Sequence, residues 1–353
     1  MRLLFKYTII GVLCLSYSCL SGQDQSSKQS NNQDFNRIVF YNVENLFDIY
    51  DDSLKRDDEF TTDGERNWNN QRFYKKLNNI YRVIVGVGEW NPPVIVGLCE
   101  IENRFVLNKL VYQTPLKTFD YKIIHEESPD RRGIDVALLY RSSGFTPIVH
   151  QAIGIRFPFD TTSRTRDILY VKGLLANSDT VHIFVNHWPS RYGGYLKTKP
   201  KREFVASVLR KQVDSLFFSD PNPNIIIMGD FNDEPWDESL KNELKAKLDT
   251  TDLQKNDVSN LMRVYQNRKD GGTSKYQESW SIIDQFIVSS NLISGKQRLQ
   301  VLNEQAQIYN PGFLLEDDFK HLGKKPYRTY IGFSYNNGFS DHLPIYIDLI
   351  KSD

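Results

Sequence analysis

The sequence predicts a layered α/β protein with mixed β-sheets. Short segments rich in Val, Ile, Phe and Tyr recur along the 353-residue chain between turn residues, a pattern typical of buried strands. Stretches with apolar residues at helical spacing come between these segments. Because strands and helices interleave without a regular β-α-β-α rhythm, we expect mixed sheets rather than a doubly wound or barrel fold.

The expected elements are short and spread along the whole chain. Strands are predicted at Arg37–Val43, Val94–Cys99, Tyr121–His125, Ile134–Arg141, Ile168–Leu175, Val181–Asn186, Ile225–Met228, Ile282–Val288 and Leu343–Ile350. One helix is predicted from the spacing of Phe73, Leu77, Ile80 and Ile84, and another from that of Val205, Val208, Leu209, Val213 and Leu216. A shorter helix is expected at Arg104–Tyr112, and the charged stretch Asp48–Arg66 is expected to be a surface loop.

Composition permits a sizeable core and restricts the partners. Apolar residues make up 40% of the chain and aromatic residues 13%, which argues against global disorder. Lys plus Arg and Asp plus Glu both count 44, so the formal net charge is zero. This balance argues against a processive nucleic-acid binder, which usually has a basic excess, but not against a hydrolase that needs positive charge only locally.

The N-terminus is typical of an exported protein. Arg2 and Lys6 precede an uncharged apolar run that is too short for a membrane span, so residues 1–19 are predicted to be a signal peptide. The residues before Cys19 resemble a lipobox, which would lipidate Cys19 and anchor the protein to a membrane. The alternative is an ordinary signal peptide cut near Ser18. We expect the periplasm, the cell envelope as an outer-membrane lipoprotein, or the outside of the cell.

Residues 20–34, rich in Ser, Gln and Asn, are predicted to be a flexible tether, and residues 35–353 to form one catalytic domain. Two of the three cysteines lie in the signal, leaving Cys99 without a disulfide partner and excluding a Cys-based zinc site. Because Cys99 ends an apolar run, we expect it to be a buried hydrophobic residue rather than a nucleophile.

Polar residues stand at the ends of the predicted strands, although the strands themselves do not require polar residues there. They are Asn42, Glu44, Glu100, Glu102, Asn186, His187, Asp230, Asn232, Asp233, Asp284, Asp341 and His342. Carboxylates and carboxamides suit Mg²⁺, Mn²⁺ or Ca²⁺. Histidines among them suit acid–base chemistry around such a cation. Each residue alone is more often a turn, a cap or a surface group, so the prediction rests on their combination.

Five stretches of this sequence resemble, in the same order, motifs of the endonuclease/exonuclease/phosphatase superfamily, whose fold is DNase I-like. They are Tyr41-Asn42-Val43-Glu44-Asn45-Leu46, Leu98-Cys99-Glu100-Ile101-Glu102, Val185-Asn186-His187-Trp188-Pro189-Ser190-Arg191, Met228-Gly229-Asp230-Phe231-Asn232-Asp233 and Gly338-Phe339-Ser340-Asp341-His342-Leu343-Pro344. Ser281-Ile282-Ile283-Asp284 is similar to the superfamily's penultimate acidic motif. The resemblance covers nearly everything after the tether and implies a four-layer α/β/β/α sandwich with two packed mixed sheets.

The resemblance also implies roles for individual residues. Glu100 would be the principal ligand of a Mg²⁺ ion, with Asn42 beside it and Asp341 in its outer shell. His342 would act as general base on the attacking water or stabilise charge on the phosphorane, with Asp284 orienting its imidazole.

Asp230 and Asn232 would position the nucleophile and a phosphate oxygen. His187 would donate to a non-bridging oxygen or protonate the leaving group, and a His at this place points to the secreted-nuclease and sphingomyelinase side of the superfamily. Fixed donors of this kind stabilise the charge that phosphoester hydrolysis develops.

Three further residues have two interpretations each. Arg166 and Arg191 could bind substrate phosphate, or could be solvated or salt-bridged surface residues. Asp135 could pair with His187 or face solvent.

Three hypotheses of function follow. The leading one is an exported, metal-dependent phosphodiester hydrolase of endonuclease type, acting on nucleic acid, with Trp188 as a base-contact candidate. The alternative keeps the chemistry but acts on a phospholipid or small phosphoester, like a sphingomyelinase, and predicts an aromatic rim from Trp188, Tyr192 and Tyr195. The third is a non-catalytic envelope binding protein, which would normally have lost one of the acidic or histidine residues named above. No protein partner is implied.

Overall fold

The computed structural model describes residues 35–351, except positions 90, 177–178, 267, 269–270 and 294–298. The predicted signal peptide, its Cys19 and the predicted tether therefore lie outside the described residues. Asp34–Asp353 belong to one compact unit. Among the described residues, no helix is both long and apolar enough to cross a membrane.

Two seven-stranded mixed sheets form the centre of this unit. The first sheet contains, in spatial order, β14 (Leu299–Val301), β20 (Ile345–Lys351), β1 (Phe35–Leu46), β2 (Ile95–Ile101), β4 (Asp135–Arg141) and β3 (Tyr121–His125), and β15 (Gln307–Ile308) also pairs with β20. The second sheet contains, in spatial order, β5 (Phe145–Ile153), β6 (Ile168–Leu175), β7 (Thr180–His187), β8 (Ile225–Asp230), β13 (Asp284–Ser289), β10 (Val258–Asn260) and β9 (Ala246–Lys247).

Smaller elements surround the sheets. Three two-stranded hairpins are β11 (Ser274–Tyr276) with β12 (Ser279–Ser281), β16 (Leu315–Asp317) with β17 (Lys324–Pro326), and β18 (Tyr330–Ile331) with β19 (Ser334–Tyr335). The α-helices are α1 (Asn70–Gly88), α2 (Arg104–Gln113) and α3 (Tyr195–Ser219). Asn69 and Asn103 cap α1 and α2, because their side chains accept the amides of Arg72 and Val106 at 3.2 and 3.1 Å.

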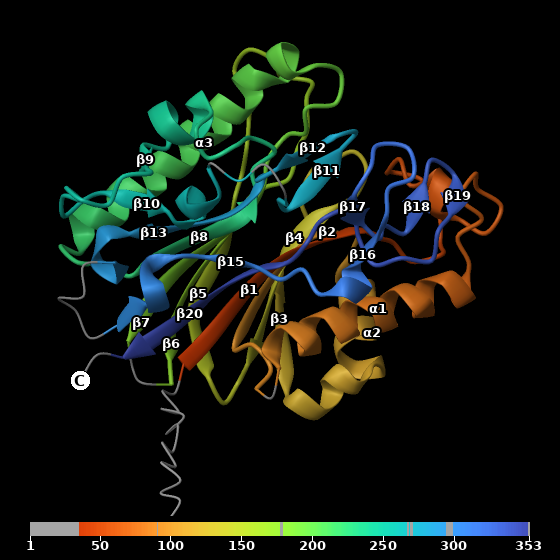
Figure 1. Ribbon diagram of the computed structural model, residues 1–353, viewed down its shortest axis with the longest axis horizontal. Coiled ribbons are helices and arrows are strands. Elements are labelled where there is room, and N and C mark those ends of the chain that lie inside the picture. Colours follow the sequence, from red (N-terminus) through yellow and green to blue (C-terminus); the bar gives the residue numbers. More distant parts are fainter. Residues whose placement is uncertain are drawn as a thin grey trace, which may run out of the picture. The chain divides into compact units, whose positions relative to one another are not determined.

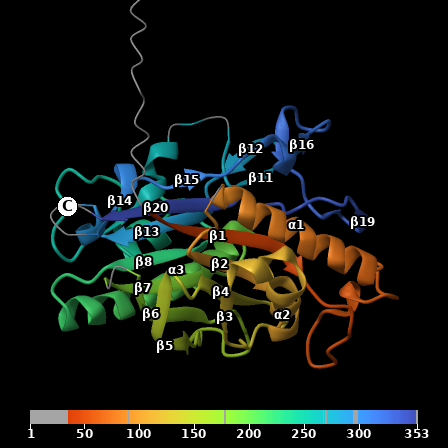
Figure 2. The same ribbon diagram turned by 90° about the horizontal axis from the view of Figure 1, so that it is seen from below.

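Alternating side chains explain the layers. In β1, Ile38 and Phe40 belong to the core between the two sheets, whereas Val39 and Tyr41 pack with residues of α1 and α2. In β8, Ile226 and Met228 face the first sheet, and the residues next to them pack with α3. Figure 1 shows α3 on one side of the paired sheets and α1 and α2 on the other, and Figure 2 shows the same arrangement from below. The predicted four-layer α/β/β/α sandwich is confirmed.

Parallel pairing brings several strand ends to one rim. In the first sheet β1 runs parallel to β2, with Asn42 opposite Cys99. In the second sheet β7 runs parallel to β8, with His187 opposite Asp230. Because the carboxyl ends of parallel strands meet at the same edge, the polar residues that follow these strands come together.

The predicted strands all occur in the structure, several with ends shifted by a few residues. The sequence pattern does not predict β5, whose residues are mostly exposed and include Pro147. An edge strand of this kind lacks the apolar run that marks buried strands. The short hairpins were missed as well, because two- and three-residue strands have no periodicity to detect.

Stability should fall in mild acid because of His182. This side chain is buried, Tyr170 Oη lies 2.7 Å from its Nδ1, and burial lowers its pKa from 6.5 to about 4. The folded state therefore takes up the proton less readily than the unfolded state. This contribution to stability is complete above pH 6.5 and is lost as pH falls towards 4, by roughly 3 kcal/mol in total.

Urea denaturation at pH 7 and pH 5 tests this expectation. Wild type should lose more unfolding free energy between the two pH values than His182→Gln does. Equal losses in the two proteins would contradict it.

Candidate active site

The rim where the strands end has unusual backbone geometry. Glu44, Asn45, Glu100 and Asn232 all have positive φ angles, of 53°, 55°, 62° and 52°. The pairing of β1 with β2 shifts register after Asn42, as expected for a bulge. Such strained residues cluster at functional sites, where the surrounding structure holds them in place. Here the bulges direct the side chains at the ends of β1 and β2 toward the same part of the rim.

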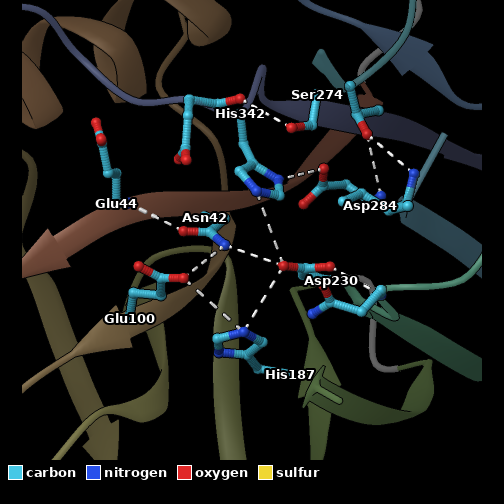
Figure 3. Close-up of polar contacts among 12 residues, drawn as sticks. Asn42, Glu44, Glu100, His187, Asp230, Ser274, Asp284 and His342 are labelled. Atoms are coloured by element: carbon cyan, nitrogen blue, oxygen red, sulfur yellow. Dashed lines mark hydrogen bonds and ion pairs between the residues drawn. The ribbon is translucent and has the colours of Figure 1, made fainter. Parts of the chain in front are cut away.

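Asn42 joins the two sheets at this rim. Its Nδ2 donates to Glu100 Oε1 at 3.3 Å and to Asp230 Oδ2 at 3.1 Å. Its Oδ1 accepts the amide of Glu44 at 3.0 Å, and the amide of Asn45 donates to Glu100 Oε2 at 2.9 Å. Figure 3 shows Asn42 between the two carboxylates. Asn42 and Glu100, predicted metal ligands, are thus brought together with Asp230.

His342 and Asp284 form a buried pair on the other side of Asp230. Asp284 Oδ2 accepts from His342 Nδ1 at 2.7 Å, and His342 Nε2 lies 3.9 Å from Asp230 Oδ2. Burial opposes a charged imidazole, but the negative charges of Asp284, Asp230 and Asp341 raise the pKa of His342 well above 6.5. The bond at Nδ1 leaves Nε2 facing the centre of the site (Figure 3), which is the orientation that a proton acceptor needs.

Thr273 holds both members of this pair in place. Its buried Oγ1 accepts the amides of Ile283 and Asp284, both at 3.1 Å, and its carbonyl accepts the amide of Leu343 at 2.7 Å. The next residue, Ser274, forms an antiparallel bridge with His342. One short segment therefore fixes the backbone of both Asp284 and His342.

His187 faces the two carboxylates from β7. Its Nε2 lies 3.7 Å from Asp230 Oδ2 and 3.9 Å from Glu100 Oε1, and its Nδ1 is buried without a hydrogen-bond partner. Burial, followed by the charges of Arg166 and Arg132, lowers the pKa of His187 well below 6.5. A neutral imidazole here acts as a hydrogen-bond donor, which favours contact with a non-bridging oxygen over protonation of a leaving group.

Asp230 is the carboxylate that the side chains of Asn42, His187 and His342 all approach. Its pKa is raised to about 7, chiefly by burial; the charge of His342 opposes this rise and that of Asp284 adds to it. Its Oδ1 accepts the amide of Asn232 at 2.9 Å. The Asn232 side chain donates to the carbonyl of Trp188 at 3.1 Å, so it braces the loop after β7.

Asp341, the third predicted metal ligand, lies in an ion cluster at the edge of the site. Arg328 joins it to Glu44, with Nη2 at 3.0 Å from Asp341 Oδ2 and Nε at 3.2 Å from Glu44 Oε1. Burial opposes ionisation of Asp341, but the charges of Arg328, His342 and Lys76 lower its pKa. Lys76 is itself buried, and burial lowers its pKa to about 8.

The two predicted phosphate-binding arginines are engaged by protein groups. Arg166 is buried and donates to Asp130 at 3.1 Å, to the carbonyl of His187 at 3.2 Å and to that of Trp188 at 2.5 Å. Arg191 donates to the Asn232 carbonyl at 2.7 Å, to Asp233 Oδ1 at 3.2 Å and to Asp237 Oδ2 at 2.7 Å. Both side chains fix the loop after β7, which favours the salt-bridged interpretation over substrate contact.

Three interpretations of other residues are corrected. Asp135 neither pairs with His187 nor faces solvent, because it is buried and its Oδ2 lies 3.1 Å from Nε2 of His125. Trp188 is 1% exposed and packs against Phe231, so it cannot contact a substrate base. Tyr195 lies beneath the guanidinium groups of Arg191 and Arg202, and of the predicted aromatic rim Tyr192 alone is fully exposed. Cys99 is buried, as expected.

The donor set fits a hard divalent cation. Asp230, Asp284 and His342 offer ligand atoms within 4.8 Å of one another, and Asn42 binds both Asp230 and Glu100. Asp284 Oδ1 is buried without a hydrogen-bond partner. Several carboxylates packed this closely repel one another unless positive charge lies between them. Oxygen donors of this kind suit Mg²⁺, Mn²⁺ or Ca²⁺ better than Zn²⁺.

Four residues that shape this site have no distinctive signal in the sequence: Lys76, Thr273, Arg328 and Arg132. Lys76 sits in an amphipathic helix and Thr273 in a loop, where neither pattern nor spacing distinguishes them. The sequence does not distinguish Arg328 and Arg132 either, because surface arginines are common. Their importance appears only when the fold brings them to the rim.

Replacing Asp284 by Asn should lower the pKa of His342. The carboxylate favours the protonated imidazole, and the amide removes that charge while leaving an acceptor. NMR titration of the His342 imidazole measures the effect. Asp341→Asn is the matched control and should lower this pKa less, since Asp341 is paired with Arg328. An unchanged pKa of His342 in Asp284→Asn would show that the Asp284 carboxylate does not stabilise the protonated imidazole.

Comparison with known structures agrees with the fold described above. The structure is similar to an endonuclease/exonuclease/phosphatase family protein from Bacteroides thetaiotaomicron, with a TM-score of 0.55, 15% identity and coverage of 90% of this chain and 96% of that one. It is similar to TDP2 from C. elegans, with a TM-score of 0.54, 14% identity and coverage of 90% and 75%. It is also similar to a mannosyl-6-phosphatase from Bacteroides thetaiotaomicron, with a TM-score of 0.53, 14% identity and coverage of 89% and 99%.

No curated protein matches the sequence. The sequence profile described as "Endonuclease/Exonuclease/phosphatase family" matches residues 37–351, which contain all the strands and helices described above except the first two residues of β1. The chain therefore belongs to the endonuclease/exonuclease/phosphatase family of phosphoester hydrolases.

Proposed function

We propose that the protein is an exported, metal-dependent phosphodiester hydrolase that acts on nucleic acid. The observation that carries this proposal is the grouping of Asn42, Glu100 and Asp230 opposite the Asp284–His342 pair. One side of this group offers oxygen donors for a cation, and the other offers a proton acceptor. Hydrolysis of a phosphoester requires both functions close enough together to act on the same bound phosphate.

His342 removes the proton from the attacking water. Its Nε2 and Asp230 Oδ2 lie 3.9 Å apart, close enough for both to bind one water oxygen. The water oxygen forms a bond to phosphorus, its proton passes to Nε2, and the bond from phosphorus to the leaving oxygen breaks. Asp284 stabilises the imidazolium that forms, because it accepts from Nδ1 at 2.7 Å.

His187 and Asn42 stabilise the phosphate during this step. The neutral His187 donates a hydrogen bond to a non-bridging oxygen, and Asn42 orients the carboxylates of Glu100 and Asp230. A Mg²⁺ ion held by Glu100 and Asn42 would supply further positive charge to the phosphate and to the leaving oxygen. The leaving oxygen takes its proton from solvent, since His187 is neutral.

Two substrate classes compete with nucleic acid: lipids and phosphate monoesters. The lipid hypothesis predicted an aromatic rim, and Trp188 and Tyr195 do not provide one. A phosphate monoester is the second candidate, because a structure of similar fold is named as a mannosyl-6-phosphatase. Nucleic acid is supported by another similar structure, in which TDP2 from D. rerio is complexed with a single-strand DNA product.

Export is proposed on the sequence alone. Arg2 and Lys6 before an uncharged run support a signal peptide, and Cys19 supports anchoring by lipid. Cell fractionation distinguishes the two kinds of export. Wild type in the membrane fraction and Cys19→Ser in the soluble exported fraction would support the lipoprotein, whereas wild type in the cytoplasm would refute export.

Hydrolysis of a phosphoester panel tests the proposed function. DNA, RNA, sphingomyelin, bis(4-nitrophenyl) phosphate and 4-nitrophenyl phosphate are each incubated with Mg²⁺, Mn²⁺ or EDTA. We expect metal-dependent cleavage of nucleic acid, with kcat reduced about 100- to 10,000-fold in His342→Ala.

The exposed histidine variant His150→Ala is the matched control and should cleave normally. Cleavage of the monoester alone would favour the second candidate. Folded wild type that cleaves nothing would favour the binding-protein hypothesis.

Thr273→Val should reduce kcat while leaving KM nearly unchanged. The substitution keeps the side-chain shape but leaves the amides of Ile283 and Asp284 without their acceptor. Asp284 is then no longer aligned with His342. A misplaced catalytic pair costs about 10- to 100-fold in kcat. Thr273→Ser keeps the hydroxyl and should retain most of the activity. Equal losses in the two variants, or a loss confined to KM, would show that the hydroxyl does not position the dyad.

A further inference from the structure

Most positive charge near the site is already neutralised. Arg166 and Arg191 donate to carboxylates and backbone carbonyls, and Arg328 spans Glu44 and Asp341. Lys76 is buried and donates to the carbonyl of Phe339 at 2.6 Å. A substrate with more than one phosphate would therefore need another cation at the rim.

Arg132 is such a cation. Its side chain is 46% exposed, and the contact of its guanidinium within the described structure is a long one, 3.9 Å from Nε to Asp130 Oδ1. Asp130 is occupied by stronger partners, since it accepts the amide of Arg132 at 2.9 Å and Nη1 of Arg166 at 3.1 Å. The guanidinium of Arg132 thus keeps donors that can bind an anion.

The backbone that carries Arg132 is firmly placed. Gly133 closes a turn by donating to the carbonyl of Asp130 at 3.2 Å, with a φ of 74° that favours glycine. Asp130 is buried and bound to Arg166, which in turn donates to the carbonyl of His187. This chain of contacts ties Arg132 to the strand end that carries His187.

Asp130 and Arg166 connect Arg132 to the backbone of His187, through contacts of 3.9, 3.1 and 3.2 Å. By contrast, no hydrogen bond or ion pair joins Arg132 to Glu100, Asp230 or His342 in the described structure. In the described structure, Arg132 therefore lies outside the group that would hold the scissile phosphate.

We propose that Arg132 binds the phosphate next to the scissile one in a polynucleotide chain. This inference rests on the proposed function and makes it narrower. A guanidinium near His187 attracts a second phosphate and repels a cationic headgroup such as choline. The protein would then prefer oligonucleotides to phosphodiesters with a single negative charge.

Two substrates that differ in the second phosphate test this proposal. Oligothymidylate has flanking phosphates, and bis(4-nitrophenyl) phosphate has none. Arg132→Gln should reduce kcat/KM for the oligonucleotide about 10- to 100-fold and for the aryl ester less than about 3-fold. Arg132→Lys should recover part of the loss, because it restores the charge without the planar fork.

Arg131→Gln is the matched control, since Arg131 is the exposed neighbour whose Nη2 donates to the carbonyl of Thr162. It should change both substrates less than about 2-fold. Equal losses on the two substrates in Arg132→Gln, or no loss on either, would overturn the proposal.

Binding of fluorescein-labelled oligothymidylate in EDTA separates this proposal from the proposed function. Arg132→Gln should weaken binding about 10-fold and lower its salt dependence by roughly one charge, whereas Arg131→Gln should not. Wild type that binds but does not cleave would refute the hydrolase and leave the role of Arg132 standing. Wild type that does not bind the oligonucleotide, or binding equal in the two variants, would overturn the role of Arg132.

Discussion

The hydrogen bond from Asn42 to Asp230 joins the two sheets where the site forms. Asn42 ends the regular part of β1 in the first sheet, and Asp230 ends β8 in the second, with 3.1 Å between their atoms. This contact exists because the sheets pack face to face through apolar residues such as Phe40 and Met228. The depth of that core sets the separation of the two strand ends, and therefore of the groups that a phosphate would meet.

Burial shifts the pKa values of the ionisable groups in the site. Asp230, His187 and His342 are all buried, and their pKa values move in different directions because their neighbours differ. The carboxylates around His342 stabilise the imidazolium that forms when it accepts a proton, whereas burial and the charges of two arginines keep His187 neutral. Two histidines in one site thus serve as proton acceptor and hydrogen-bond donor. In water, without these surroundings, they would titrate alike.

The residues around the site mainly hold other residues in place. Thr273 fixes the backbone at Asp284, while Arg166 and Arg191 fix the loop after β7. A guanidinium with carboxylate and carbonyl partners resists rotation, so it positions a loop more firmly than an apolar contact would. This use of arginines explains why arginines near catalytic motifs need not bind substrate. It leaves phosphate recognition to an exposed side chain such as Arg132.

The sequence by itself determined the strands, the layered fold and the residues at the strand ends. Apolar runs reveal buried strands, and a polar residue such as Glu100 or Asp230 stands out directly after one. The motifs are local, so a single sequence was enough to recognise them. The edge strand β5 escaped because its exposed residues follow no apolar pattern.

Tertiary structure alone decided what each side chain contacts. The sequence left Asp135 between His187 and solvent, but the pairing of β3 with β4 places it beside His125. It made Trp188 a surface candidate, although packing against Phe231 buries it. Arg166 and Arg132 look alike in the sequence, and only the fold shows that one is surrounded by acceptors and the other is open. Burial and partners arise from residues far apart in the chain, which no local pattern records.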